Sequence, residues 1–227
     1  MKSAKVNLGR PVWACLSLMF MGIGGGSSYA NITPVLESVT ACSNCSSLDG
    51  GSYSGSGYAW LYQIDLDVNE TVDPSSNTLG TSGSSYGVIY DFGPMLGSIV
   101  ATGDVGNTSD FTVSTALTTT SPSGVNPTDS TSLLNVIYQA KVGTDINGAT
   151  LSGGILGTLT IISQFAGNPS HTASFVGQAI SNVTGLSTAN IGSVETPNAT
   201  PEPASVSLLF VGLVGAYIFG RKRVLRG

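Results

Sequence analysis

The chain has 227 residues, of which only 9% are charged, and it contains 30 glycines. This length has room for one globular domain, and a composition poor in charge and rich in Gly, Ser and Thr favours strands and turns over salt-bridged helices. Between positions 31 and 200 one lysine stands against twelve acidic residues, a net charge of −11, which argues against a nucleic-acid partner.

Residues 1–30 have the organisation of a secretory signal peptide. Three basic residues precede an apolar run at 12–23, and Ser28 and Ala30 supply the small side chains that signal peptidase reads. The apolar run is shorter than the ~20 residues that a membrane-spanning helix needs. We therefore expect cleavage after Ala30, which makes Asn31 the mature N-terminus.

Cys42 and Cys45 form a C-x-x-C pair downstream of this signal. In an oxidising compartment such a pair is expected to form a disulfide. The alternative, a redox site, requires the pair at the start of a helix in a βαβ setting, whereas residues 46–51 are typical of a turn. We predict a structural disulfide worth at most about 2 kcal/mol. A zinc site lacks ligands, because Cys15 leaves with the signal peptide and His171 is the only histidine.

The clearest strand pattern lies at residues 58–69, where apolar and polar residues alternate. Side chains two positions apart share one face of a strand, so Tyr58, Trp60 and Tyr62 are expected to face a core. Shorter runs, separated by Gly, Ser, Asn, Asp and Pro clusters, predict further strands. This spacing indicates an all-β domain at residues 31–196, with the form of an antiparallel β-sandwich. The shorter runs lie at 87–92, 110–118, 133–142 and 155–163.

A group of oxygen-bearing side chains overlaps the end of the first strand pattern, and such clusters are the ligands that calcium prefers. The spacing begins like a calcium-binding loop, but Glu70 occupies the place where the sharp turn requires glycine. We expect a solvated acidic strand face and keep calcium as the alternative. The calcium candidates are Asp65, Asp67, Asn69 and Asp73.

The sequence gives no pattern typical of an enzyme. His171 is the only imidazole, no Gly-x-Ser-x-Gly nucleophile elbow occurs, and we expect this histidine to be a solvated loop side chain. Asp91 and Asp110 are notional glycosidase carboxylates whose separation the sequence does not define. With one histidine, one lysine and no arginine between positions 31 and 200, we predict neither catalysis nor a cofactor.

Residues 204–220 form an uncharged apolar segment that is followed by Arg221, Lys222 and Arg223. The segment is near the lower limit of the ~17 to 25 residues of a spanning helix, and snorkelling basic side chains can close the shortfall. Because positive charge stays inside, the preceding chain is expected outside. The sequence therefore predicts a single C-terminal transmembrane helix at 204–220.

Just before this segment stands Thr200-Pro201-Glu202-Pro203-Ala204-Ser205. Together with the apolar segment and the basic tail, it resembles the C-terminal sorting signal of the PEP-CTERM family of exported bacterial proteins. Each proline biases its preceding residue toward extended backbone, a shape that a protease can bind. The resemblance implies processing near Pro201, Glu202 and Pro203 by a membrane-embedded exosortase. The alternative is a proline spacer between a domain and its anchor.

Four strand-like blocks, at 88–92, 109–115, 156–159 and 190–194, also resemble a recurrent ectodomain of PEP-CTERM proteins, which bears on fold more than on function. The resemblance implies a structural protein of the cell surface or the exopolysaccharide matrix of a biofilm. Its partners would be signal peptidase, exosortase, the inner membrane and exopolysaccharide. We expect residues 197–227 to hold the domain in the periplasm until processing sends it to the cell surface or outside. The alternatives are a carbohydrate- or calcium-binding module and a secreted hydrolase.

Overall fold

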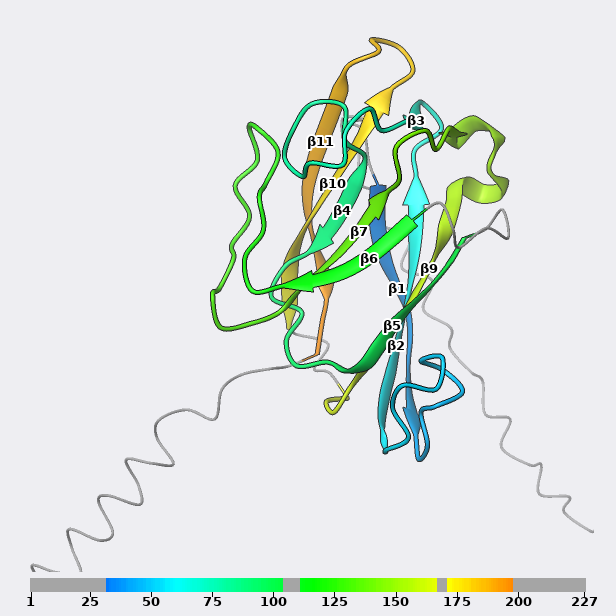
Figure 1. Ribbon diagram of the computed structural model, residues 1–227, viewed down its shortest axis with the longest axis vertical. Coiled ribbons are helices and arrows are strands. Elements are labelled where there is room, and N and C mark those ends of the chain that lie inside the picture. Colours follow the sequence, from blue (N-terminus) through cyan, green and yellow to red (C-terminus); the bar gives the residue numbers. More distant parts are fainter. Residues whose placement is uncertain (1–31, 104–110, 167–170, 198–227) are drawn as a thin grey trace, which may run out of the picture.

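The computed structural model describes residues 32–103, 111–166 and 171–197, and these residues form two antiparallel β-sheets (Figure 1). One sheet has four strands in the order β1-β2-β9-β5, and the other has seven, with β6, β7, β4 and β10 as neighbours. The prediction of an all-β fold built from antiparallel sheets is confirmed. The strands are β1 (Ile32–Cys42), β2 (Gly57–Leu66), β3 (Glu70–Val72), β4 (Tyr86–Ile89), β5 (Leu96–Gly103), β6 (Phe111–Ala116), β7 (Asn135–Ala140), β8 (Ile146–Asn147), β9 (Ile155–Ser163), β10 (Thr172–Ser181) and β11 (Ser187–Glu195).

Strand β10 is the organising strand of the seven-stranded sheet. Along one edge it pairs with β11 from Thr172 to Ile180, and along the other it pairs first with β4 and then with β3. The short strand β8 continues the sheet beyond β3, while β7 and then β6 continue it beyond β4. Elements from both halves of the chain therefore meet on β10.

Strand β2 confirms the strongest sequence pattern, but it ends earlier than the alternation predicts. Its last residue is Leu66. Asp67 then accepts hydrogen bonds from two backbone N–H groups, that of Asn69 on its carboxylate and that of Glu70 on its carbonyl, which turns the chain. Val68, expected on the apolar face, is 58% exposed in this turn. A local turn therefore overrides the continuing alternation.

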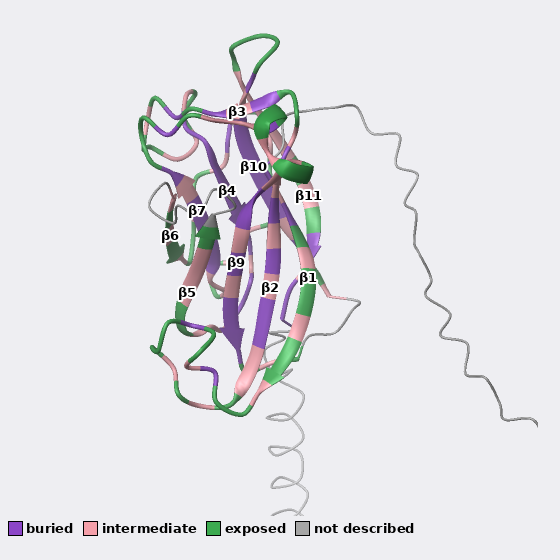
Figure 2. Cartoon of the chain, turned by 90° about the vertical axis from the view of Figure 1, so that its right-hand side faces the viewer, coloured by how far each residue is buried: buried purple, intermediate pink, exposed green. Residues whose placement is uncertain are grey.

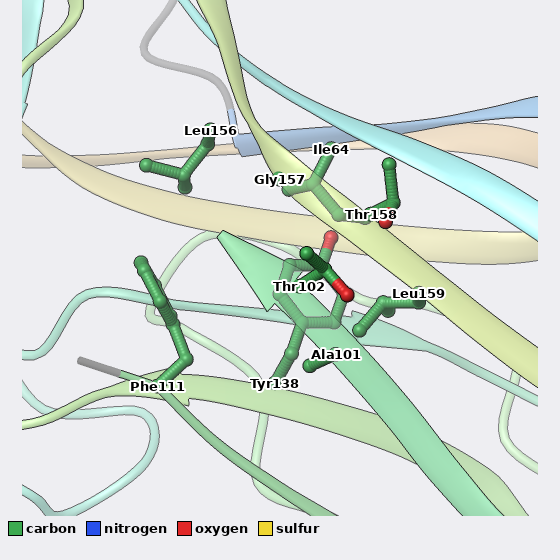
Figure 3. Close-up of a pocket in the computed structure, with 9 residues that line it drawn as sticks. All are labelled: Ile64, Ala101, Thr102, Phe111, Tyr138, Leu156, Gly157, Thr158 and Leu159. Atoms are coloured by element: carbon green, nitrogen blue, oxygen red, sulfur yellow. The ribbon is translucent and has the colours of Figure 1, made fainter. Parts of the chain in front are cut away.

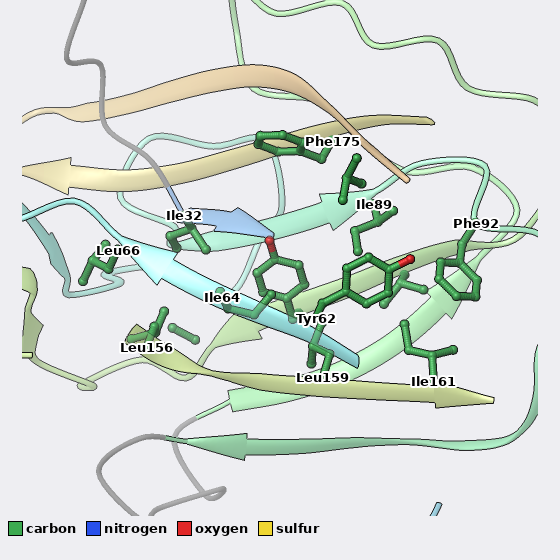
Figure 4. Packing of buried hydrophobic residues seen from close by; sticks show 14 of the residues in the cluster. Ile32, Tyr62, Ile64, Leu66, Ile89, Phe92, Leu156, Leu159, Ile161 and Phe175 are labelled. Atoms are coloured by element: carbon green, nitrogen blue, oxygen red, sulfur yellow. The ribbon is translucent and has the colours of Figure 1, made fainter. Parts of the chain in front are cut away.

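The main core lies between the two sheets (Figure 4). Trp60 and Tyr62 are 2% and 0% exposed, so the prediction that they face the core is confirmed. Both rings meet Phe92 edge to face, with centroids 6.3 and 6.1 Å apart. Their polar atoms remain paired, because Trp60 Nε1 donates to the Phe165 carbonyl and Tyr62 Oη to the Glu195 carbonyl. Each such side chain contributes about 1.5 to 3 kcal/mol by burial.

A second apolar cluster covers the outer face of the seven-stranded sheet. It contains Tyr86, Val88 and Ile137, and Leu79 and Val125 from two connecting loops pack against it. All four residues of β4 are consequently buried. The four-stranded sheet differs, since Figure 2 shows buried stretches along β2 and β9 but a largely exposed edge strand β1. The sandwich thus has one face covered by loops and one that is covered only in part, where Cys45 packs against Ala59 and Ile162.

Within the described ranges, no helix has the length and apolar character needed to cross a membrane. The predicted signal peptide at 1–30, and the predicted processing motif, transmembrane helix and basic tail at 201–227, lie outside those ranges.

Candidate functional site

The residues predicted to direct sorting are not among those that the structure describes. This applies to the signal-peptide cleavage residue Ala30, to Pro201, Glu202 and Pro203, and to the basic stop at 221–223. The remaining candidates all lie in the β-domain, where their surroundings are defined.

Cys42 and Cys45 are joined by a disulfide with a Cα–Cα distance of 5.3 Å. Cys42 is the last residue of β1, and Cys45 is fully buried against Ala59 and Ile162. The backbone N–H of Cys45 also donates to the carbonyl of Gly55. The disulfide therefore fixes the loop between β1 and β2 against the end of the sheet, where a structural role suits it better than an exposed redox role.

The calcium candidates do not gather around one point. Asp65 accepts a hydrogen bond from Gln63 at 2.8 Å, Asp67 is used by the turn at Asn69, and Asp73 is exposed. Across the described ranges, no three His, Cys, Asp or Glu side chains are grouped so as to hold a metal ion. The carboxylates of Asp65 and Asp67 serve the strand and its turn, and that of Asp73 faces solvent.

Glu70 contradicts the prediction of a solvated acidic face. It is 4% exposed, because β3 places it beside Ser181 of β10. Burial, and secondarily the negative charge of Asp67, raise the pKa of Glu70 from 4.5 to about 7, while a hydrogen bond from Thr188 lowers it. Its carboxylate accepts a hydrogen bond from Thr188 Oγ1 of the neighbouring strand β11, so it is a buried acid held within the sheet.

His171 is half-buried rather than a solvated loop side chain. Its Nδ1 lies 3.1 Å from Thr196 Oγ1, and the Thr196 N–H donates to the His171 carbonyl at 3.4 Å. These contacts continue the pairing of β10 and β11 by one residue pair. The histidine thereby ties down the end of β11, a structural role that the sequence did not indicate.

Asp91 also makes hydrogen bonds that have a structural role. Its backbone lies in the left-handed region, with φ of 49°. The N–H of Asp91 donates to Asn135 Oδ1, and its carboxylate accepts from the Ser130 N–H, each at 2.8 Å. Asp129 in turn accepts from Asn135 Nδ2 at 2.9 Å. This network joins the end of β4 to the loop before β7. Asp110, the notional partner of Asp91, lies outside the described residues.

An apolar pocket opens between the two sheets, where β5 and β9 face β6 and β7 (Figure 3). Its space is about 350 Å³ including the open mouth. Tyr138 of β7 lines it, and the hydroxyl of this residue is buried with no hydrogen-bond partner. Burial strongly raises the pKa of Tyr138, which stays a neutral phenol. The sequence placed Tyr138 in a strand, but nothing in it indicated an unpaired hydroxyl.

Comparison with known proteins finds no match: no protein-family model fits the chain, and no curated protein or solved structure is detectably similar to it. The class is accordingly defined by the structure itself, as an acidic, antiparallel, all-β domain with two facing sheets.

Proposed function

We propose that this chain is an exported bacterial envelope protein, a structural component of the cell surface or the exopolysaccharide matrix. It is delivered by its signal peptide, held by the segment at 204–220, and processed by an exosortase at Pro201, Glu202 and Pro203. The observation that carries the proposal is the order of a proline-flanked glutamate, an apolar segment and a basic stop, which follows the β-domain in the same chain as a secretory signal.

Two features of the β-domain support this proposal. A disulfide between Cys42 and Cys45 suits an oxidising compartment outside the cytoplasm. In addition, Ile32 is fully buried at the start of β1 and Pro197 is buried after β11, so the folded body fits between the two sorting segments. The six residues from 198 to 203 span at most about 20 Å. Because the motif at 201–203 directly precedes the apolar segment at 204–220, an enzyme in the membrane would find it beside its own active site.

The test is maturation in a host that has an exosortase. Replacing Pro201, Glu202 and Pro203 together by alanine should leave uncut protein in the inner membrane, detected by mass spectrometry as chains that keep residues 204–227. The wild-type protein should lose this tail.

The control is replacement of Arg221, Lys222 and Arg223 by alanine, which leaves the motif intact and removes the positive-inside stop. This variant should disturb membrane retention and topology instead. Maturation of the triple-alanine motif variant at the wild-type rate would make 204–220 an ordinary anchor with a proline spacer.

The rival binding functions have less support. Trp60 and Tyr62 lie in the core, so they cannot form an aromatic platform for a glycan. The carboxylates of Asp65, Asp67 and Asp73 point to separate partners or to solvent rather than to one cation.

A further inference from the structure

Strand β11 is a free edge of the seven-stranded sheet. It pairs with β10 along its whole length, and no other described strand pairs with it. The register of the two strands is continuous, without a bulge. The strand is partly exposed, and its exposed residues, Ile191 and Ser193, lie in its second half (Figure 2). A free edge of this kind presents backbone N–H and C=O groups that can pair with another strand.

Two hydrogen bonds at the ends of the β10–β11 hairpin show which backbone groups of β11 are free. The Ser181 N–H donates to the Leu186 carbonyl, and the Thr196 N–H donates to the His171 carbonyl. In an antiparallel pair, residues bonded to the partner strand alternate with residues whose N–H and C=O groups point to the other side. The even-numbered residues of β11 are therefore bonded to β10, and the odd-numbered residues direct both groups away from it.

The outward-directed residues are Ser187, Ala189, Ile191, Ser193 and Glu195. At the last of them the outward carbonyl is already used, because Glu195 accepts a hydrogen bond from the Tyr62 hydroxyl at 2.7 Å. The edge that remains for a further strand is therefore centred on Ile191, with Ala189 and Ser193 on either side of it.

The other sheet edges have features that hinder pairing, and β11 lacks them. Edge strand β1 contains Pro34, which has no N–H, and a bulge at Glu37. Strands β5 and β6 pack beside each other, and β8 has only two residues. Residues 187–194 of β11 contain neither proline nor a charged side chain. Because natural proteins protect long edge strands that must not pair, this unprotected edge favours a strand as its partner.

The charge of the domain bears on which strand this is. Between positions 31 and 200 the net charge is −11, so copies of the domain repel each other over most of their surface. The uncharged edge at 187–194 is a place where two copies can approach without bringing carboxylates together. A basic partner, in contrast, gains nothing from this edge, because it offers no carboxylate along those residues.

Antiparallel pairing of β11 with itself also matches the side chains. A two-fold axis at Ile191 brings the two Ile191 side chains together, and Ala189 of each copy then faces Ser193 of the other. Ile191 is 46% exposed, so this contact removes apolar surface from water. Glu195 of each copy faces Ser187 of the other, whereas parallel pairing would place the two Glu195 carboxylates side by side.

We propose that β11 pairs with β11 of a second copy of this chain, antiparallel about a two-fold axis at Ile191. The seven-stranded sheets of the two copies then form one continuous sheet. The pairing is a property of the β-domain and does not depend on the proposed export or processing.

The test is sedimentation of the full-length chain in detergent micelles over a dilution series. Wild type should form a dimer that dissociates on dilution. Ile191→Lys and Ile191→Glu each place like charges opposite one another, so either variant alone should dimerise at least about 10-fold more weakly. An equimolar mixture of the two variants should regain most of the lost affinity, because opposite charges then face each other across the axis. This recovery occurs only if position 191 faces itself.

Val35→Lys is the matched control, because Val35 is 39% exposed on the edge strand β1 and the substitution adds the same charge. It should leave dimerisation unchanged. Both variants at Ile191 should keep the wild-type melting temperature closely, since that side chain lies outside the core. The proposal is overturned if wild type stays monomeric, if the Ile191 variants alone dimerise like wild type, or if their mixture regains nothing. Equal weakening by Val35→Lys would also overturn it.

Discussion

Glu70 should make the stability of the β-domain depend on pH. Its side chain is 4% exposed, and the hydrogen bond that it accepts from Thr188 Oγ1 is long, at 3.4 Å. Burial first, and then the charge of Asp67, raise its pKa from 4.5 to about 7. Between these pH values the folded protein holds a proton that the unfolded chain releases. Folding therefore becomes less favourable as the pH rises through this range.

The magnitude follows from the two pKa values. A carboxyl group with a raised pKa contributes its full stability below pH 4.5 and loses it as the pH approaches about 7. A rise of the pKa from 4.5 to about 7 corresponds to a loss of about 3 kcal/mol in the free energy of unfolding at high pH. The measured loss is expected to be smaller, about 1 to 2 kcal/mol, because relaxation and water entry around an ionised buried group reduce its desolvation penalty.

Urea unfolding at about pH 5 and about pH 8 measures this loss. Trp60, the single tryptophan downstream of the predicted signal peptide, is the fluorescence reporter. Glu70→Gln should be more stable than wild type at the higher pH by about 1 to 2 kcal/mol and should lose most of the pH dependence. Thr188→Val should make the stability depend more strongly on pH, because this substitution removes the hydrogen bond that lowers the pKa of Glu70.

Glu37→Gln is the matched control. Glu37 is exposed on β1, so this substitution should change neither the stability at the higher pH nor its pH dependence. Equal stability of wild type at the two pH values would refute the argument, as would a Glu70→Gln variant that is less stable than wild type at the higher pH.

Three further results are expected. Mass spectrometry of the exported protein should find Asn31 at the N-terminus, and retention of residues 1–30 would contradict the signal peptide. Alkylation without reductant should label neither cysteine, and Cys45→Ser should lower the melting temperature more than Cys42→Ser, because Cys45 is fully buried; labelled thiols or the reverse order would contradict this. Gly87→Ala should destabilise the domain by about 1 to 3 kcal/mol, because its Cβ would overlap the ring of Tyr138, and an unchanged urea midpoint would exclude that contact.

The sequence predicted best those strands whose apolar runs are bounded by turn-forming residues. The runs at 110–118, 133–142 and 155–163 each contain a strand of the structure, and the run at 87–92 overlaps β4. Their common feature is a stretch of apolar and β-branched residues bounded by turn-forming residues, which local sequence reveals directly. The class of fold follows from such local signals.

Strand β10 was missed because long-range contacts determine its residues. Gly177 and Gln178 interrupt its apolar pattern in mid-strand. The carbonyl of Ile32 in β1 lies against Gly177, where a side chain would not fit. Gln178 is 3% exposed because it donates hydrogen bonds to the carbonyls of Thr81 and Ser84. None of these partners is near in sequence, so periodicity alone could not reveal the strand.

The candidate site residues show the same difference between local signals and long-range contacts. The spacing of Cys42 and Cys45 is a local signal, whereas the burial of Glu70 depends on its pairing with Ser181 more than one hundred positions away. The hydroxyl of Tyr138 is unpaired because the residues that surround it in the fold supply no hydrogen-bond partner. The sequence around a residue does not show whether its buried polar atoms will have hydrogen-bond partners in the folded protein.

The place of β10 in the seven-stranded sheet has a consequence for the order of folding. Residues 172–181 are among the last of the domain to leave a ribosome or cross a membrane, yet β3, β4 and β11 all pair with them. Contacts between distant segments form slowly, because the intervening chain must first be closed into a loop. Until β10 arrives, β3 and β4 expose unpaired backbone that can pair with other chains. The part of the domain before residue 172 is therefore prone to aggregation until β10, which is encoded near the end of the domain, has formed.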